Sequence, residues 1–471
     1  MDRLIGFLTY DDTEFPFEFN FANQTLYLYP SQDLCKAKYN NFAYFLTEQK
    51  HEHDQVKWIS EILIYGITSS QEHIVFSVEE KPRIYEGFLY FKVNWYLLLF
   101  DEIEKTNISA FSVEGTTVDS FYPPIIALDQ RIEIDNSDRS RTYTVSTLPN
   151  PSYSCGQYVL KENIEISIEV KAEATTNIDN YRKPISAKSL FTTYFSTPTT
   201  IDTLIDAFKY TLQFFMYVTH RKNIDINKAT VLSKNKEGVL EACGFLYFPQ
   251  FDEAENNTEA FKKVIQYSDL KEKTAFIFKM IIDKNISLEY FASSFDSIRS
   301  YSLPRIIMLY SSFEHLFMSI YGESSAYSKE FYEVQCKVLQ FLDQLIDEYK
   351  GKDKKKKEKA KSFKDINNKI NPGGFSTYVS LALNDCSEIM EPFIKKYFRS
   401  NGTSDYKEII DVISKRVCKM RNAIAHCRLD IEFAPDDLCD IVLMDFLLYA
   451  VLLKHIGLCT EECKEAISRL R

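Results

Sequence analysis

The strongest constraint on how this chain folds is a run of twenty residues, from Tyr406 to Ala425, that contains neither glycine nor proline. At about 100° per residue, its apolar positions span roughly 80° of a helical wheel. An apolar face of this kind predicts an amphipathic helix with one buried side. The apolar residues recur at spacings of 4, 4, 3 and 4 and are Ile409, Ile413, Val417, Met420 and Ile424.

This run ends in the hexapeptide Arg421-Asn422-Ala423-Ile424-Ala425-His426. On the same wheel Asn422 and His426 lie opposite the apolar stripe, and Arg421 lies on the flank between the two faces. An arginine five residues before a histidine is weak evidence alone, because a chain of this composition gives roughly 0.2 such pairs by chance. An ordinary exposed histidine beside an ordinary exposed arginine therefore remains the alternative interpretation.

These residue types suit one reaction in particular. Cleavage of RNA without a metal needs a base for the 2′-hydroxyl proton, an acid for the leaving oxygen, and a fixed cation for the charged phosphorus centre. We expect His426 to act as base and then as acid, because imidazole ordinarily changes protonation near neutral pH. We expect Arg421 to bind phosphate oxygens in bidentate fashion, and Asn422 to orient His426 or bind phosphate.

The geometry of a regular helix sets a condition on this site. Arg421 and His426 would lie about 140° apart around the axis and about 7.5 Å apart along it. A long guanidinium or a loosened helix near Cys427 would close part of that gap. A two-fold dimer that brings two such motifs together across one phosphate would close it fully, and we favour this shared site.

The pattern Arg421-Asn422-x3-His426, at the end of a helix in a helical C-terminal region, resembles the signature of the HEPN superfamily. The order of regions along the chain resembles the ApeA-like branch of that superfamily, which is implicated in anti-phage defence. The resemblance implies a metal-independent endoribonuclease without a cofactor, active as a homodimer, which leaves 2′,3′-cyclic phosphate and 5′-hydroxyl ends. It also implies an abortive-infection role, with tRNA loops as a plausible target and a phage protein as a possible trigger.

Three regions are expected, which together make an α+β multidomain protein. Residues 1–150 alternate apolar and polar side chains, as in Phe15, Phe17 and Phe19, and predict a β-sandwich-like sensor or regulatory domain. Residues 151–295 predict a mixed α/β segment, with a linker or turn at 151–160 and a helix at 201–218 capped near Thr199 or Thr200. Residues 300–471 are expected to form an all-α helical bundle, and the resemblance implies that this bundle is of HEPN type.

Helix boundaries within the last region are marked by proline and glycine. Pro304 is expected to open a helix that carries residues 306–320. Residues 435–437 (Pro-Asp-Asp) are expected to begin the final helix, 438–456, which Gly457 closes. That helix is apolar enough to form the centre of the bundle or a dimer face.

Charge and composition limit the classes of function. The net charge of −11 argues against general nucleic-acid coating, and residues 1–300 are the acidic part, with 30 Lys+Arg against 42 Asp+Glu. No stretch approaches eighteen consecutive apolar residues, so no membrane span is expected. Ten cysteines without a CxxC, and an N-terminus unlike a secretory signal, predict a reduced, cytoplasmic protein.

Several further residues are candidates for supporting roles. Glu314 lies at the edge of the apolar face of its predicted helix and is expected either to support Arg421 or His426 or to be plainly solvated. Eight lysines between Lys350 and Lys361 are expected to be a solvated segment, or else an arm that attracts phosphate. Contacts to RNA are expected from Lys415, Lys419 and Arg428.

Two other interpretations stay open. In the first, the HEPN-like bundle is catalytically silent and the protein is an RNA-binding or protein-binding scaffold. A different enzyme in the N-terminal part lacks support, since no GxGxxG, GxxxxGK[ST], GxSxG or HExxH occurs. No metal is expected, although scattered cysteines or the stretch from His51 to Asp54 leave a zinc site as an alternative.

Overall fold

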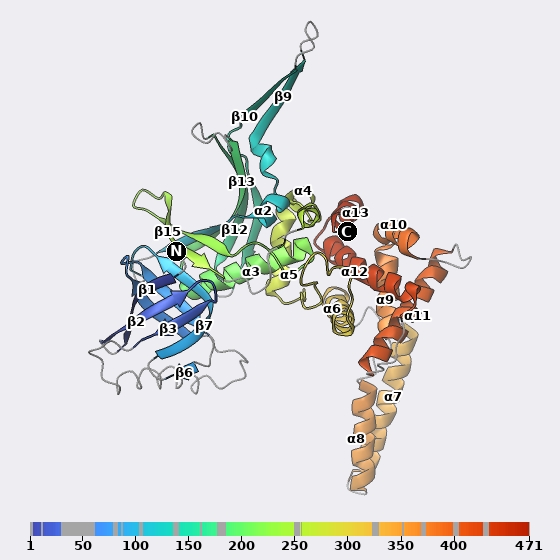
Figure 1. The fold of residues 1–471 in the computed structure, drawn as a ribbon. Helices are drawn as coiled ribbons and strands as arrows, with labels where there is room; N and C mark the ends of the chain where they lie inside the picture. Colours follow the sequence, from blue (N-terminus) through green and yellow to red (C-terminus); the bar gives the residue numbers. More distant parts are fainter. Residues whose placement is uncertain are drawn as a thin grey trace. The chain divides into compact units, whose positions relative to one another are not determined.

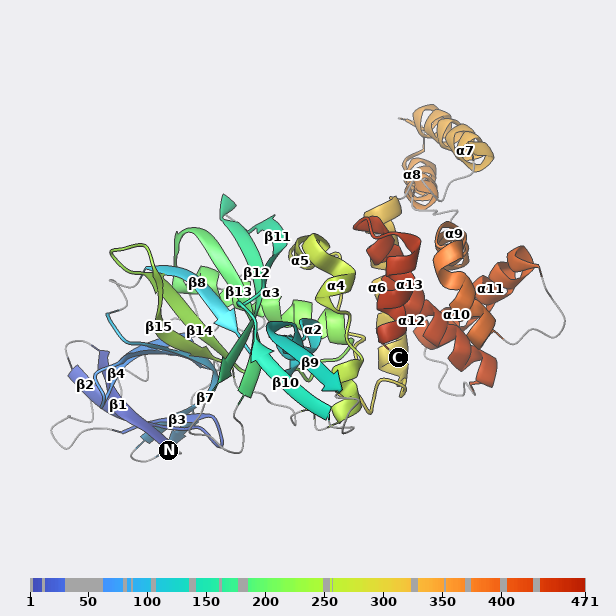
Figure 2. The ribbon, with the colours of Figure 1, turned by 90° about the horizontal axis from the view of Figure 1, so that it is seen from above.

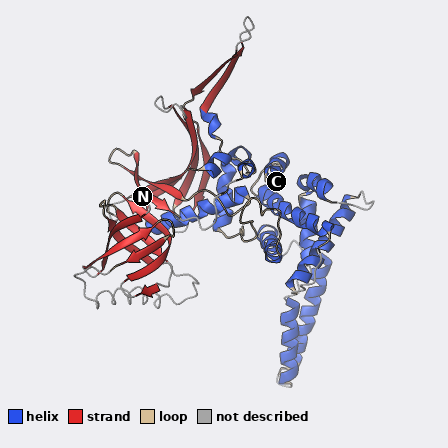
Figure 3. Cartoon of the chain, viewed as in Figure 1, coloured by secondary structure: helices blue, strands red, loops and turns tan. Residues whose placement is uncertain are grey.

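The computed structural model has strands in the first part of the chain and helices in the last part (Figure 3). Its contacts divide the chain into two compact units. Unit 1 is Met1–Lys279 with Ser293–Asp296, and unit 2 is Met280–Ala292 with Ser297–Arg471. The structure describes residues 3–10, 13–29, 62–78, 83–85, 88–102, 107–134, 141–160, 163–176, 185–248, 255, 257–322, 329–350, 353–368, 374–398, 405–426 and 433–470. The coarse expectation of β structure followed by helices is confirmed.

Unit 1 is built on a large antiparallel sheet, in which all described strands pair except a two-stranded ribbon of β9 and β10 (Figure 1). The strands are β1 Arg3–Tyr10, β2 Thr13–Asn20, β3 Thr25–Leu28, β4 Ile62–Thr68, β5 His73–Val78, β6 Arg83–Tyr85, β7 Phe88–Leu99, β8 Ile108–Val113, β9 Leu128–Ile134, β10 Arg141–Thr147, β11 Ser152–Val159, β12 Glu165–Thr176, β13 Ile185–Thr199, β14 Lys228–Lys234 and β15 Leu240–Tyr247. The helices among them are α2 Thr116–Phe121, α3 Ile201–Thr219, α4 Tyr267–Leu270 and α5 Thr274–Ile282, with 3₁₀ turns at Pro124–Ala127, Thr258–Lys262 and Lys271–Lys273.

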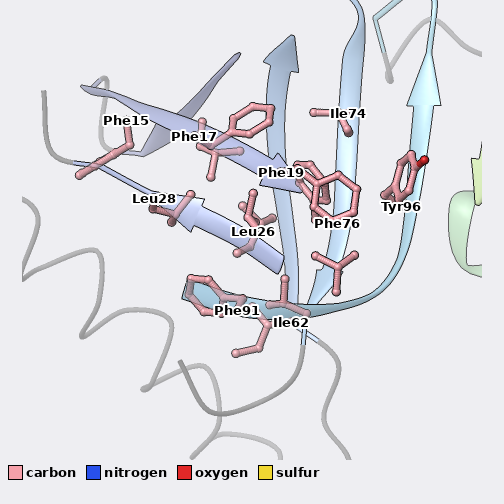
Figure 4. Packing of buried hydrophobic residues seen from close by; sticks show 14 residues of the cluster. Phe15, Phe17, Phe19, Leu26, Leu28, Ile62, Ile74, Phe76, Phe91 and Tyr96 are labelled. Carbon is pink, nitrogen blue, oxygen red and sulfur yellow. The ribbon is translucent and has the colours of Figure 1, made fainter. Parts of the chain in front are cut away.

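The first strands close into a ring rather than the expected sandwich (Figure 2). The pairing runs β1–β2–β3–β7–β5–β4 and returns from β4 to β1. Alternation along β2 sends Phe15, Phe17 and Phe19 into the ring, where they are buried with residues of the facing strands (Figure 4). Alternation determines which face is buried but not whether a sheet stacks or closes, so the sandwich expectation was wrong in this respect.

Strand β7 joins the ring to the rest of the sheet. It pairs with β3 through residues 89–92 and with β15 through residues 96–99. From β15 the sheet continues through β14, β8, β13 and β12 to β11. Strands from both sides of residue 150 therefore belong to one sheet and one compact unit, so the expected boundary at residue 150 does not separate two units.

The expected linker at 151–160 is instead strand β11, and that expectation was wrong. β11 pairs antiparallel with β12, and its register shifts between Ser154 and Gly156. Gly156 has φ +96°, and a Cβ there would lie 2.6 Å from the carbonyl oxygen of Glu272. Gly156 therefore lies at a β-bulge rather than in a turn. Because it has no side chain, the segment that contains Glu272 can approach the strand closely.

Helix α3 confirms the expected helix at 201–218 and covers one face of the sheet. The Thr200 hydroxyl accepts the backbone N–H of Thr203 at 3.4 Å, so Thr200 is the N-cap. Phe208 packs against Phe111 of β8, with ring centroids 5.9 Å apart. Aromatic rings therefore form much of the contact between this helix and the sheet.

Unit 2 consists mainly of helices in its described parts, joined by turns and loops. Its helices are α6 Leu303–Tyr321, α7 Lys329–Glu348, α8 Lys354–Asn368, α9 Phe375–Asp385, α10 Ser387–Tyr397, α11 Tyr406–Ala425, α12 Pro435–His455 and α13 Thr460–Arg469. Pro304 lies in the first turn of α6, whose N-cap is Ser302, and this agrees with the expected start. Helix α12 packs against α6, α10, α11 and α13, so it lies at the centre of the unit.

Helix α12 agrees with the expected helix at 438–456, and Gly457 follows it with φ +87°. The expectation that it is the last helix was wrong, because α13 comes after it. Helix α13 is short and mostly polar, and its buried side chains are Cys463, Ala466 and Ile467. So narrow an apolar face gives a weak periodic signal in the sequence.

An ion pair fixes α11 to α12. The Arg416 guanidinium donates from Nε and Nη2 to the two carboxylate oxygens of Asp440, both at 2.7 Å. Its Nη1 also contacts Asp436 at 3.3 Å. Asp440 is fully buried, and burial raises its pKa to about 6, against the lowering effect of the Arg416 hydrogen bonds and charge. The bidentate geometry favours the charged pair.

Replacing Arg416 with alanine should destabilise unit 2 by about 3–5 kcal/mol at pH 8, because a buried carboxylate then loses its cation. The loss should be smaller at pH 5. Burial acting without Arg416 moves the pKa of Asp440 further upward, and the protonated acid needs no cation. Urea unfolding at both pH values measures the effect, and hydrogen exchange of α11 and α12 peptides locates it.

The matched control is Asp436→Asn, since Asp436 is a half-exposed partner of the same guanidinium. This change should cost less than about 1 kcal/mol. Equal losses in the two variants, or a loss in Arg416→Ala that grows as the pH falls, would contradict the role given to Asp440.

Candidate functional site

Helix α11 places the hexapeptide in its last turn, and the structure confirms the helix over the twenty residues without glycine or proline. Asp405 caps its start by accepting the backbone N–H of Lys407 at 3.1 Å. Four of the five predicted apolar positions are buried, whereas Ile409 is half-buried and its neighbour Ile410 is buried in its place. The predicted apolar face is therefore the face that packs against the rest of unit 2. In the first turn of the helix, the buried position is shifted by one residue, from Ile409 to Ile410.

The polar residues of the motif lie on the accessible side of the helix. Asn422 and His426 are exposed, and Arg421 is half-exposed. His426 is the C-cap residue, with φ −91° and ψ 17°, and its backbone N–H donates to the carbonyl oxygen of Asn422 at 3.0 Å. The helix thus ends at His426, and its imidazole is carried on the first residue that leaves the regular helix.

Arg421 is held by neighbours from two other helices. Its Nη2 lies 3.2 Å from Oε2 of Glu314 on α6, and its Nη1 donates to Oδ1 of Asn422 at 3.3 Å. The guanidinium carbon lies 5.8 Å from the centre of the Phe375 ring, at the start of α9. Helices α6, α9 and α11 therefore meet at this arginine.

The pair between Arg421 and Glu314 is accessible to water, since each side chain is 36% exposed. An ion pair of this exposure contributes about 0–1 kcal/mol. The guanidinium is oriented but not locked. Its remaining N–H groups make no hydrogen bond within the described residues, so they are able to bind an anion.

Of the three residues expected to contact RNA, two lie on α11 and one lies outside the described residues. Lys415 pairs with Asp411 at 2.6 Å, and Lys419 is exposed on the same helix. Arg428 lies outside the described residues.

His315, which has no evident partner in the sequence, has its Nε2 2.8 Å from the carbonyl oxygen of Lys284. No hydrogen bond joins Arg421 to His426 in the described part of the chain, as expected from a separation of about 140° around the helix.

Two neighbours of the motif had no usable signal in the sequence. Phe375 is buried under the guanidinium, but nothing in its surroundings along the chain connects it with Arg421. Cys418 lies one turn before Asn422, whose Nδ2 is 3.7 Å from the sulfur. The spacing of four residues permits that contact, although many such spacings occur in any helix.

Metal ligands do not gather in the described residues. No group of three or more His, Cys, Asp or Glu side chains is arranged there to hold an ion. The described cysteines, from Cys155 to Cys463, are free thiols. The stretch from His51 to Asp54 lies outside the described residues. Within the described parts, every helix is too short or too polar to cross a bilayer.

Comparisons with protein-family models, curated proteins and solved structures find no match to this chain. The resemblance to HEPN proteins therefore rests on the hexapeptide and on the order of the regions. The chemistry of the site has to be argued from its own residues.

Chemical modification tests the accessibility of the motif. Diethyl pyrocarbonate should modify His426 rapidly, because its side chain is exposed. His220 is only 1% exposed and serves as a control within the same protein, which should react only after unfolding. Peptide mapping by mass spectrometry measures both rates. Protection of His426 to the level of His220 would remove it as a candidate for acid–base chemistry.

Proposed function

We propose that this protein is a metal-independent endoribonuclease. The observation that supports the proposal lies at the end of α11, where Glu314 orients the half-exposed Arg421 and where the side chains of Asn422 and His426 are exposed. An oriented cation and an accessible imidazole are the two groups that transesterification of RNA requires, although one helix presents them in different directions.

The reaction follows from the chemistry of these groups. His426 takes the proton of the ribose 2′-hydroxyl, and that oxygen attacks the adjacent phosphorus. Arg421 stabilises the added negative charge on the phosphorus centre through two hydrogen bonds. The bond from phosphorus to the 5′-oxygen then breaks, and the leaving oxygen takes a proton from an imidazolium. The products are a 2′,3′-cyclic phosphate and a 5′-hydroxyl.

A shared site in a homodimer suits this geometry better than a site within one chain. Arg421 is turned towards Glu314 on α6, and His426 leaves the helix at its end. Two motifs related by a two-fold axis bring the arginine of one copy towards the histidine of the other. One imidazole then acts as base and the second as acid, so neither has to move between the two oxygens.

The biological role proposed for the enzyme is abortive infection against phage in the cytoplasm. Loops of structured RNA such as tRNA are suitable substrates, because unstacked nucleotides reach the in-line geometry that a duplex prevents. Unit 1, with most of the acidic residues, is the part proposed to sense a phage protein or to restrain the nuclease. This role follows from the resemblance to the ApeA-like branch.

One observation favours a second candidate, a catalytically silent scaffold that binds RNA or protein. Arg421 already has a carboxylate partner in Glu314. In a scaffold this pair would be purely structural, and replacing His426 would change nothing measurable. The two functions therefore differ in their response to substitutions at one position.

Replacing His426 with alanine should lower the rate of RNA cleavage by about 10²–10⁴, through loss of acid–base catalysis. Arg421→Ala should lower it by about 10²–10³, through loss of charge stabilisation. The measurement is incubation of the purified protein with total RNA in EDTA, followed by mapping of the new ends. Cleavage that EDTA abolishes would indicate a metal enzyme instead.

The matched control is His315→Ala, since His315 is an exposed histidine on α6 that contacts the backbone of residue 284. It should leave cleavage unchanged. If wild-type protein produces no new RNA ends, or if cleavage persists in both His426→Ala and Arg421→Ala, the nuclease proposal fails in favour of the scaffold.

Glu314→Ala should reduce kcat about tenfold, because Arg421 then loses the carboxylate that orients it. The melting temperature should change little, since the pair is half-exposed. Glu314→Gln retains a hydrogen-bond acceptor and should recover part of the rate. Steady-state kinetics on a short RNA, together with thermal unfolding, separates the two effects. An unchanged kcat in the alanine variant would show that Glu314 does not position Arg421.

A further inference from the structure

Helices α7 and α8 form a hairpin whose described side chains bury very little surface. They pack chiefly against each other. No described side chain of α7 is buried, and among the described side chains of α8 only Ala360 is. Two helices with so little buried surface are marginal in water, because most helical stability in proteins comes from packing of an apolar face. Another surface is needed to complete the core.

The uncovered face of the hairpin is apolar. Val334, Val338 and Phe341 of α7 are 59%, 40% and 57% exposed, and they lie within about 60° on the helical wheel. Phe363 of α8 is 61% exposed. Exposed apolar side chains that share one face of a helix, as the three of α7 do, are typical of an interaction surface. We call these four residues the apolar stripe.

A groove lies beside the apolar stripe, between the two helices. Its floor is formed by apolar side chains, and its α8 side carries lysines. The volume is about 270 Å³, which is below the usual range for a small-molecule site but enough to receive a large side chain. The lining residues are Leu342, Leu345, Tyr349, Lys355, Lys356, Lys359, Ala360 and Phe363.

The two helices carry opposite charge. Helix α7 has two lysines and five carboxylates, a net −3, and α8 has seven lysines and two carboxylates, a net +5. Within the hairpin, Lys364 pairs with Asp343, and Lys356 pairs with the capping Asp353. The exposed Glu348 of α7 lies on the side of the apolar stripe away from α8, whereas Lys355 and Lys359 lie on the α8 side.

We propose that this face binds the same face of a second copy of the chain, so that two hairpins form a four-helix bundle. A two-fold axis along the hairpin, through the apolar stripe, places the acidic side of each copy opposite the lysine side of the other. Glu348 of each chain then faces Lys355 and Lys359 of the second copy. Phe341 of each chain is available to fill the groove of the other, and the apolar stripes form the new core.

Charge complementarity favours a second copy over RNA. Lysines alone suit phosphate, but an exposed stripe of valine and phenylalanine offers no recognition of a phosphate backbone. The acidic residues of α7 would also repel a polyanion close to the groove. A second copy satisfies the apolar stripe, the acidic flank and the lysine flank together. This pairing uses none of the residues that the proposed nuclease chemistry uses.

Analytical ultracentrifugation of the full chain tests the proposal. Phe341→Glu should weaken dimerisation at least about thirtyfold, as expected for loss of a central aromatic anchor. Its far-ultraviolet circular dichroism should stay unchanged, because Phe341 is exposed within a single chain. A matched control is Phe276→Glu, an exposed phenylalanine of α5 outside the hairpin, which should dimerise as the wild type does.

Charge reversal gives a second test that does not depend on the apolar stripe. Glu348→Lys alone, and Lys355→Glu with Lys359→Glu alone, should each weaken dimerisation, because like charges then face each other. Mixing the two variants should restore it as a heterodimer, in which both contacts pair opposite charges. Recovery on mixing supports the proposed two-fold arrangement.

Three outcomes would overturn the proposal. The first is a wild-type chain that stays monomeric at about 50 μM, a concentration well above the dissociation constant of a stable dimer. The second is equal dimerisation of wild type and Phe341→Glu. The third is a monomer that binds single-stranded RNA through Lys355 and Lys359, which would assign the hairpin to RNA instead.

Discussion

The ion pair between Arg416 and Asp440 is the contact on which the arrangement of unit 2 depends most directly. It joins α11 to α12, the helix around which the unit packs, and it does so at a fully buried carboxylate. A buried charge is tolerated only when its partner is well aligned. Because Arg421 follows Arg416 by five residues on the same helix, this contact fixes where the motif is presented. The position of the motif is thus set by a contact that α11 makes about one and a half helical turns before Arg421.

In unit 1 the corresponding constraint is the length of β7. Twelve residues allow one strand to pair with β3 over its first part and with β15 over its last part. The ring and the larger sheet therefore share a strand and fold as one unit, whichever side of residue 150 their strands come from. A shorter strand would have permitted the separate N-terminal domain that the sequence pattern suggested.

Local features were predicted well from the sequence, and features that depend on distant contacts were not. Helix α11, the Thr200 cap and the start of α6 follow from periodicity and capping residues that lie within a few positions. Closure of the ring, the bulge at Gly156 and the short helix α13 depend on which segments meet in space. In the site, outward orientation of His426 followed from the wheel, whereas Phe375 beneath Arg421 had no local signal.

The strength of the contact between Glu314 and Arg421 bears on what the site is able to do. A fully buried pair would hold the guanidinium so firmly that phosphate could not displace the carboxylate. A free arginine would lose side-chain entropy each time it bound phosphate. A half-exposed pair worth about 0–1 kcal/mol keeps the guanidinium oriented and still allows exchange, because phosphate offers the guanidinium charge-assisted bonds of the same kind. Glu314 thus orients Arg421 and also competes with the phosphate that the proposed reaction requires.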